Sequence, residues 1–245
     1  MICFDSNIKW GVKMIELNKI YNIDCLKGIK KLPDECVDLV LTDPPYNISQ
    51  KNNLHTMKSG KRTIDFGEWD YEFDQEYWIK KVSSKVKTGG SIIIFNALEN
   101  MGDIKKALED NGFTFKEFLT WEKTNPMPRN RDRLYVTARE TAIWAVKGRG
   151  WVFNRQKSTY ENGFFKCPLV HHSKRIHKTQ KPIELMEDLI KIHSNKGDVV
   201  LDPFSGSAST AVSCINLGRN YIGFELDEEY FKLSLRRVED IKGEF

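Results

Sequence analysis

The strongest constraint on the fold of this chain is the alternation of short, almost continuously apolar runs with segments of helical periodicity. The apolar runs are predicted strands: Lys19–Ile23, Val37–Leu41, Ser91–Phe95, Phe115–Trp121, Thr141–Val146, Val199–Leu201 and Tyr221–Phe224. The periodic segments are predicted helices: Cys25–Lys31, Gln75–Lys87, Asn100–Asn111, Ile183–His193, Ser209–Leu217 and Glu228–Asp240. Strands that are apolar on both sides must be covered on both faces. The pattern therefore predicts an α/β fold with a largely parallel sheet between helices.

The length of 245 residues fits one domain with a sizeable core. Residues 1–13 show no clear periodicity and are expected to be an N-terminal extension, followed by a single domain over residues 14–245. The sequence has neither a run of about 18 apolar residues nor the pattern of a signal peptide, which predicts a cytoplasmic protein. Its five cysteines are scattered, so neither a disulfide framework nor a zinc ribbon is indicated.

Charge is distributed unevenly along the chain, although the formal net charge is only +4. The segment from Lys123 to Lys181 has 14 Lys and Arg against 3 Asp and Glu, a net charge of +11, so the remainder carries −7. Within it, Gly148–Lys178 mixes basic and aromatic residues and is expected to be a long loop. Such a segment predicts a recognition insert for a polyanion such as DNA. A basic face that is merely solvated is the alternative.

The motif Asp43-Pro44-Pro45-Tyr46 follows the predicted strand Val37–Leu41. The two prolines lack an N–H and fix φ, so the chain leaves the strand in an extended conformation. Ligands bind at the carboxyl edge of a parallel sheet. We expect Asp43 and the Pro44 carbonyl to accept the two N–H groups of a planar exocyclic amine, while Tyr46 stacks on the ring. A tight turn that only ends a strand is the alternative.

A second predicted strand, Val199–Leu201, runs into the small-residue loop Asp202–Ala208, which opens a helix. The backbone of such a loop approaches a ligand closely, and the helix N-terminus favours an anionic group. Glu225 ends the following strand, where a carboxylate accepts hydrogen bonds from ribose hydroxyls. Dinucleotide sites look similar, but the Walker loop and the Gly-x-Gly-x-x-Gly spacing are both missing. A nicotinamide cofactor is therefore weakly supported.

Together, the two motifs resemble those of the amino-methylating DNA methyltransferases, which carry Asp-Pro-Pro-Tyr and Asp-Pro-Phe-x-Gly-Ser. The catalytic motif comes first, the basic segment second and the cofactor loop last, an order that resembles the circularly permuted β group. Asn47–Ser49, Asp65–Asp70 and Asn125–Asn130 look most like adenine methyltransferases of the MboII type. The resemblance covers nearly all of Met14–Asp240. It implies a Rossmann-like sheet of seven strands, S-adenosylmethionine as cofactor and, commonly, a homodimer.

The resemblance also implies roles for individual residues. Asp43, Pro44, Pro45 and Tyr46 would be catalytic. The segment His177–Pro182 would precede the helix beside the methionine end of the cofactor. Ala208 stands where the family usually has glycine, which would weaken cofactor affinity or require a wider loop. The implied cofactor-binding residues are Asp24, Cys25, Asp43, Thr179, Lys181, Asp202, Pro203, Phe204, Gly206, Ser207, Ser209, Thr210 and Glu225.

The implied reaction moves a methyl group from S-adenosylmethionine to the N6 amine of adenine in DNA, as the modification part of a restriction-modification system. The target base must leave the helix to be reached. Asp rather than Ser at position 43 favours adenine over the N4 amine of cytosine. An RNA or protein-glutamine substrate is less favoured, as is a DNA-binding protein with a decayed cofactor site. The histidines near Cys167 lack ligand-like pairing, so no metal site is predicted.

Two further expectations concern the basic segment. Arg129, Arg131 and Arg133 alternate after two prolines, and an extended chain would place them on one face. We expect this row, with Lys174 and Arg175, to bind the DNA backbone; ion pairs across a dimer interface are the alternative. Trp121 is expected either to line the target pocket or to lie in the core, whereas Trp144 is expected in the core.

Overall fold

The computed structural model describes residues 15–47, 73–128, 130, 132–177 and 179–243. The extension expected at residues 1–13 lies outside these residues, as do the motif Asp65–Asp70 and all of Asn47–Ser49 except Asn47. The strands are β1 (Lys19–Asn22), β2 (Val37–Thr42), β3 (Val86–Asn96), β4 (Phe113–Lys123), β5 (Arg139–Lys147), β6 (Phe164–Cys167), β7 (Val199–Asp202) and β8 (Asn220–Glu225). The helices are α1 (Cys25–Lys30), α2 (Gln75–Ser83), α3 (Met101–Asp110), α4 (Ile183–His193), α5 (Ser209–Leu217) and α6 (Glu228–Gly243), with short 3-10 helices η2 (Leu98–Asn100) and η3 (His172–Lys174).

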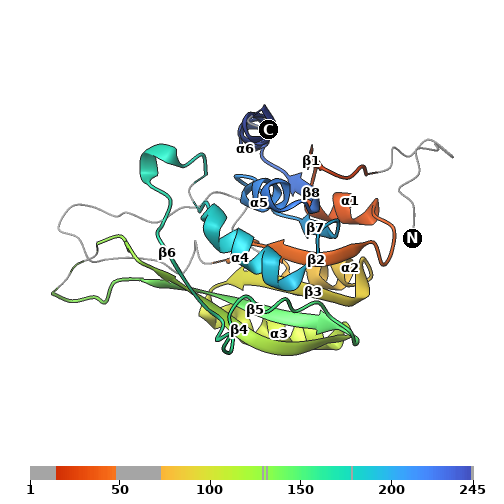
Figure 1. Ribbon diagram of the computed structural model, residues 1–245, viewed down its shortest axis with the longest axis horizontal. Coiled ribbons are helices and arrows are strands. Elements are labelled where there is room, and N and C mark those ends of the chain that lie inside the picture. The colour runs from red at the N-terminus through yellow and green to blue at the C-terminus, as the bar shows by residue number, and fades with distance from the viewer. Residues whose placement is uncertain (1–14, 48–72, 129, 131, 178, 244–245) are drawn as a thin grey trace.

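All described strands join one sheet in the order β1-β8-β7-β2-β3-β5-β4-β6 (Figure 1). Pairing is antiparallel only where β5 lies between β3 and β4, and parallel at every other neighbouring pair. The predicted α/β class and the mostly parallel sheet are confirmed. The carboxyl ends of β1, β8, β7, β2 and β3 therefore meet at one edge of the sheet, which places Asp43, Asp202 and Glu225 along the same border.

The described sheet has eight strands, whereas the resemblance implied seven. The additional strand is β6, which lies inside the segment Gly148–Lys178 that was expected to be a loop. It pairs with the end of β4, and the Trp121 indole N–H donates to the Cys167 carbonyl at 3.0 Å. A strand of four residues is too short to produce a recognisable pattern between basic and aromatic neighbours, so little in the sequence indicates it.

Helices cover both faces of the sheet, as the apolar strands require. On one face α1, α2 and α3 pack against residues such as Val40, Ile92 and Leu201. On the other face α4, α5 and α6 pack against residues such as Leu41, Ile93 and Val200. Successive side chains of each central strand thus pack into two separate cores, one on each face of the sheet. None of the described helices is long and apolar enough to cross a membrane.

The boundary between α2 and β3 differs from the prediction. The helix was expected to continue to Lys87, but it ends at Ser83, and β3 begins at Val86 and runs through Gly89 and Gly90. A Cβ on Gly90 would lie 2.9 Å from the Lys87 carbonyl oxygen and 3.0 Å from that of Asp38. These glycines therefore permit a close approach of neighbouring backbone. In a sequence, a Gly-Gly pair is also typical of a turn.

Asn47 and Phe73 flank residues 48–72 and are tied to each other by two hydrogen bonds. The Asn47 side-chain amide donates to the Phe73 carbonyl at 2.7 Å, and the Phe73 N–H donates to the Asn47 Oδ1 at 2.9 Å. Asn47 has a φ of +57°, a conformation that asparagine tolerates better than most residues. This reciprocal pair fixes the point at which the chain leaves the Asp-Pro-Pro-Tyr turn.

Candidate active site

The Asp-Pro-Pro-Tyr turn is held by side chains from two helical segments. The Pro45 carbonyl accepts a hydrogen bond from the Gln75 side chain, and the Tyr46 carbonyl accepts one from the Asn100 amide at 2.8 Å. In the described part of the chain, no group donates to the Pro44 carbonyl. The turn therefore fixes two of its carbonyls internally, while the carbonyl next to Asp43 accepts from no described group.

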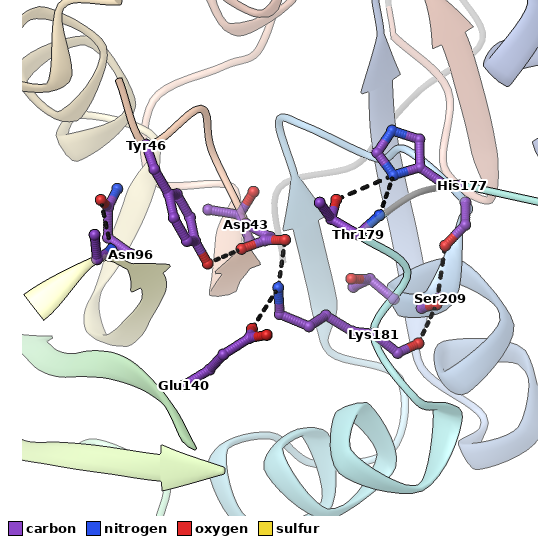
Figure 2. Close-up of polar contacts among 12 residues, drawn as sticks. Asp43, Tyr46, Asn96, Glu140, His177, Thr179, Lys181 and Ser209 are labelled. Atoms are coloured by element: carbon purple, nitrogen blue, oxygen red, sulfur yellow. Dashed lines mark hydrogen bonds and ion pairs between the residues drawn. The ribbon is translucent and has the colours of Figure 1, made fainter. Parts of the chain in front are cut away.

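Asp43 lies at the centre of a chain of polar contacts (Figure 2). The Tyr46 hydroxyl donates to its Oδ1, and the Lys181 ammonium donates to its Oδ2. Lys181 also lies 3.1 Å from Glu140 Oε2, and Glu140 Oε1 in turn lies 2.7 Å from the Lys123 ammonium. These groups come from β2, from the segment before α4, and from β4 and β5, so the contacts join distant parts of the sequence.

Burial and neighbouring charges act against each other in this cluster. Burial raises the pKa of Asp43, although Lys181 opposes that effect. Burial alone would lower the pKa of Lys181, but Asp43 and Glu140 outweigh it and raise that pKa. Burial would likewise raise the pKa of Glu140, and Lys181 with Lys123 lowers it instead. Two carboxylates and two ammonium groups thus compensate one another in a site where a single charge would be costly.

Asp202 connects this cluster to the predicted cofactor loop. Its Oδ1 accepts from the Thr42 hydroxyl and its Oδ2 from the Thr210 hydroxyl, both at 2.7 Å. The Phe204 N–H also donates to Oδ1, at 3.2 Å. Burial raises the pKa of Asp202 to about 6. The carboxyl was predicted to bind cofactor, but its contacts here tie β2, β7 and α5 together directly behind Asp43.

The loop from Pro203 to Ala208 presents backbone groups at the carboxyl edge of the sheet. The Gly206 N–H donates to Glu225 Oε2 at 2.7 Å, and the Asp227 N–H donates to Glu225 Oε1 at 2.8 Å. Helix α5 begins after Ala208, which has a φ of +60° and provides no side-chain cap. The Ser205 hydroxyl is buried without a partner among the described residues. The uncapped amides and this hydroxyl leave polar groups for a ligand.

The segment His177–Lys181 bridges the loop and Asp43. The Ser209 hydroxyl donates to the Lys181 carbonyl at 2.8 Å, while the side chain of Lys181 reaches Asp43. Thr179 contacts His177 Nδ1 through its N–H at 3.3 Å and through its hydroxyl at 3.1 Å. A Cβ on Gly206 would lie 3.8 Å from the His177 ring. Thr179 thus lies beside the loop, whereas the ammonium of Lys181 belongs to the Asp43 cluster.

The remaining predicted cofactor residues lie around the same edge in different ways. Asp24 caps α1 by accepting from the Lys27 N–H at 3.1 Å, and burial raises the pKa of the adjacent Cys25 thiol to about 12. Phe204 packs edge-on against aromatic rings of the neighbouring core. The hydroxyls of Ser207 and Ser209 lie 3.1 Å apart. Strand β8 lies between β1 and β7, so Glu225 at the end of β8 lies between Asp24 and this loop.

The residues predicted to bind DNA are only partly described. Arg129 and Arg131 lie outside the described residues. Arg133 is exposed but belongs to a turn, since its N–H and that of Leu134 both donate to the Asn130 carbonyl, at 3.2 and 2.9 Å. The extended conformation assumed for this arginine is therefore wrong. Lys174 is exposed in η3, and the Arg175 Nε donates to the Val170 carbonyl at 2.6 Å.

The two tryptophans are in the core. Trp121 is 1% exposed, which decides against a place in the target pocket. Trp144 is buried as predicted and packs against His193, with ring centroids 4.5 Å apart. The absence of a hydrogen-bond partner for His193 Nδ1 within the described structure agrees with a burial-lowered pKa of about 3 for that ring.

Sequence reasoning missed several residues of the site. Glu140 and Lys123 complete the charge cluster, and Arg237 of α6 donates to the Ser207 carbonyl of the predicted cofactor loop at 2.7 Å. Burial lowers the pKa of Arg237. The available signal was a charged residue next to a continuously apolar strand, as at Glu140. That signal does not say which partner the charge will meet.

Comparisons with known proteins agree with this geometry. The family described as DNA methylase, N6_N4_Mtase, matches residues 37–236. The type II methyltransferase M2.MboI of Moraxella bovis is 32% identical over 92% of this chain and 90% of its own length. M2.DpnII of Streptococcus pneumoniae is 31% identical over 88% of this chain and 87% of its own length.

Solved structures give the same result. The crystal structure of the M1.HpyAVI-SAM complex is similar with a TM-score of 0.73 and 38% identity, over 90% of this chain and 98% of that one. The cytosine-N4-specific PvuII DNA methyltransferase has a TM-score of 0.69 at 18% identity, over 94% and 93% of the two chains, and shares the fold. On the family match and the identity to these relatives, the chain belongs to the N6_N4_Mtase family of DNA methylases.

Proposed function

We propose that this protein is an S-adenosylmethionine-dependent DNA methyltransferase that modifies the N6 amine of adenine, as the modification part of a restriction-modification system. We place it in the circularly permuted β group, because the Asp43 motif precedes the basic segment and the Asp202–Ala208 loop. The observation that carries the proposal is the pair of acceptors at the end of β2. One is the Asp43 carboxylate, which accepts from Tyr46 and Lys181, and the other is the Pro44 carbonyl, to which no described group donates.

The chemistry follows from these acceptors. The lone pair of an aromatic amine is delocalised into its ring, and accepting both N–H bonds at Asp43 and Pro44 favours a more tetrahedral, more nucleophilic nitrogen. When bound, S-adenosylmethionine supplies the methyl group, whose bond to sulfur breaks as the bond to nitrogen forms. The nitrogen then loses one proton, which the hydrogen-bonded Asp43 carboxylate is placed to accept. Positioning and preorganised acceptors provide the acceleration.

The loop around Gly206 fits this cofactor. The uncapped N-terminus of α5 offers amides to its carboxylate, and Glu225 lies where an acid accepts ribose hydroxyls. Asp24 and Cys25 would lie toward its adenine, and Thr179 toward its methionine end. The intact Gly206–Glu225 contact argues against a DNA-binding protein with a decayed site.

Substrate binding is proposed on the distribution of charge. We infer that the target base is flipped out of the duplex and stacks on Tyr46 once the hydroxyl contact with Asp43 is released. A homodimer is proposed as the working assembly. The proposed backbone contacts are Arg129, Arg131, Arg133, Lys174 and Arg175.

The test identifies the methylated base. Purified protein is incubated with unmethylated genomic DNA and methyl-labelled S-adenosylmethionine, and the digested nucleosides are separated by chromatography. Label in N6-methyladenine is expected. Label in N4-methylcytosine would show that the target base is cytosine, whose amine the same acceptors can hold. The absence of label from both nucleosides would overturn the proposal. Asp43→Ala is the matched control: it should lose transfer and keep cofactor binding, since the carboxylate contacts the base.

A further inference from the structure

Lys181 is charged, buried and incompletely used by the protein. Its side chain is 6% exposed, and its ammonium contacts Asp43 Oδ2 and Glu140 Oε2. An ammonium group has three N–H donors. Only the contact with Asp43 is a hydrogen bond, since Glu140 Oε2 is an ion-pair contact without one, and no other acceptor in the described part of the chain contacts the ammonium. At least one donor therefore remains next to the carboxylate that would receive the target amine. A buried donor in this place indicates an acceptor supplied by the ligand.

The surroundings fix where this donor lies. Glu140 holds Lys181 from one side and is itself held by Lys123 at 2.7 Å. The Lys181 Nζ also lies 5.0 Å from the ring centroid of Phe95 and 6.0 Å from that of Tyr46. Figure 2 shows the Lys181 ammonium between Asp43 and Glu140, on the side of the carboxylate away from the Tyr46 hydroxyl. The ammonium is therefore clamped rather than free to move.

Resting on the proposed function, we propose that Lys181 donates its remaining hydrogen bond to the ring nitrogen beside the target amine, N1 of adenine. Asp43 and Lys181 then form an adjacent acceptor and donor that together recognise the amidine edge of the base. Glu140 is a positioning residue in this scheme, because it touches Lys181 and not the base. The structure thus assigns base selection to the same carboxylate that prepares the amine.

The pair is selective because of hydrogen-bond polarity. Adenine presents an N–H donor beside a ring-nitrogen acceptor, and cytosine presents the same order at its amine. Guanine and thymine present a carbonyl acceptor beside a ring N–H, which would oppose Asp43 to an acceptor and Lys181 to a donor. Buried polar groups left without partners are the strongest basis for rejecting a near-isosteric ligand. The pair therefore accepts the amine edge of adenine or cytosine, and it rejects thymine and the O6 edge of guanine; the 2-amine of guanine lies on a different edge of the base, next to the sugar.

The test removes the acceptor without removing the amine. Once the modified position is mapped, duplexes carry either adenine or 1-deazaadenine there, and kcat/KM is measured for both. The wild-type enzyme should lose on the order of tenfold to a hundredfold with 1-deazaadenine, the range for a hydrogen bond to a charged group. Lys181→Met should be slower with adenine but should no longer distinguish the two bases. Equal discrimination by the variant and the wild type would overturn the proposal.

Two further measurements keep the test decisive. Wild-type enzyme that methylates both duplexes equally well refutes the contact, even if Lys181→Met does not fold. Glu140→Gln should reduce the discrimination ratio while leaving cofactor affinity unchanged, and an unchanged ratio would remove its positioning role. Because the ratio is measured on an enzyme already shown to methylate adenine, its failure is separate from failure of the proposed function.

Discussion

Replacing Asp202 by asparagine should change how the stability of the protein depends on pH. Burial raises the pKa of this carboxyl from its ordinary value of 3.8 to about 6, against the opposing hydrogen bonds from Thr42 and Thr210. The folded state therefore holds the proton more tightly than the unfolded state does. The favourable contribution of Asp202 is complete below pH 3.8 and is lost as the pH rises through 6.

The size of the effect follows from the two pKa values. The interval from 3.8 to about 6 corresponds to about 3 kcal/mol at 1.36 kcal/mol for each unit. Asparagine has the same shape and no proton to lose, so Asp202→Asn escapes this loss. The side-chain NH₂ of asparagine cannot accept the hydrogen bond that one of the two threonine hydroxyls donates, but the effect of that change does not vary with pH. Only the pH dependence of the difference between variant and wild type is used.

Urea unfolding of both proteins at a series of pH values from about 3 to 8 measures this difference. The unfolding free energy of Asp202→Asn minus that of the wild type should rise by about 3 kcal/mol and level off above pH 6. Groups such as Asp43 and Glu225 titrate in both proteins and largely cancel. A second pair, with Thr42→Val in both backgrounds, should show a larger rise because a donor that stabilises the carboxylate is gone. A flat difference would refute the assigned burial effect.

Three other predictions concern Glu225, Ala208 and Arg133. Glu225→Ala should weaken S-adenosylmethionine by about 1.5–3 kcal/mol in calorimetry, since ribose hydroxyls lose a charged acceptor, and unchanged affinity would remove Glu225 from the site. Ala208→Gly should raise the free energy of unfolding by up to about 1 kcal/mol, because the positive φ of this position is present without ligand and glycine adopts it more readily; a less stable variant would contradict that reasoning. Arg133→Ala should reduce the slope of log affinity for DNA against log salt by about 0.9 if it contacts a phosphate. An unchanged slope with a shift from dimer to monomer would instead place Arg133 at an interface.

Much of the fold was predictable because the central strands are buried on both sides. Val37–Leu41 and Ser91–Phe95 are largely apolar, and the structure places both in the middle of the sheet. The strand at the edge of the sheet was harder to predict. Strand β6 is short, and its two exposed positions hold an apolar residue, Phe164, and a charged one, Lys166, so its sequence does not alternate between polar and apolar residues. Its pairing with β4 depends on a partner more than 40 residues away.

The residues of the candidate site likewise divide into those that the sequence could predict and those that it could not. Asp43 and Glu225 were predictable because each ends an apolar strand, and the order of a parallel sheet brings strand ends together. Glu140 was not, because it lies at the start of an antiparallel strand and approaches Asp43 only through Lys181. Arg133 shows a further limit: alternation suggested an extended chain, but hydrogen bonds to the Asn130 carbonyl close a turn.

The reciprocal hydrogen bonds between Asn47 and Phe73 bear on how enzymes of this kind could diversify. They hold the two flanking residues together next to the Asp-Pro-Pro-Tyr turn, whatever sequence connects them. The entropy of closing a connection grows slowly, by about 0.6 kcal/mol for each doubling of its length. A segment inserted between such anchors can therefore be exchanged as a cassette, in evolution or in the laboratory, without moving the turn that holds Asp43 and Tyr46.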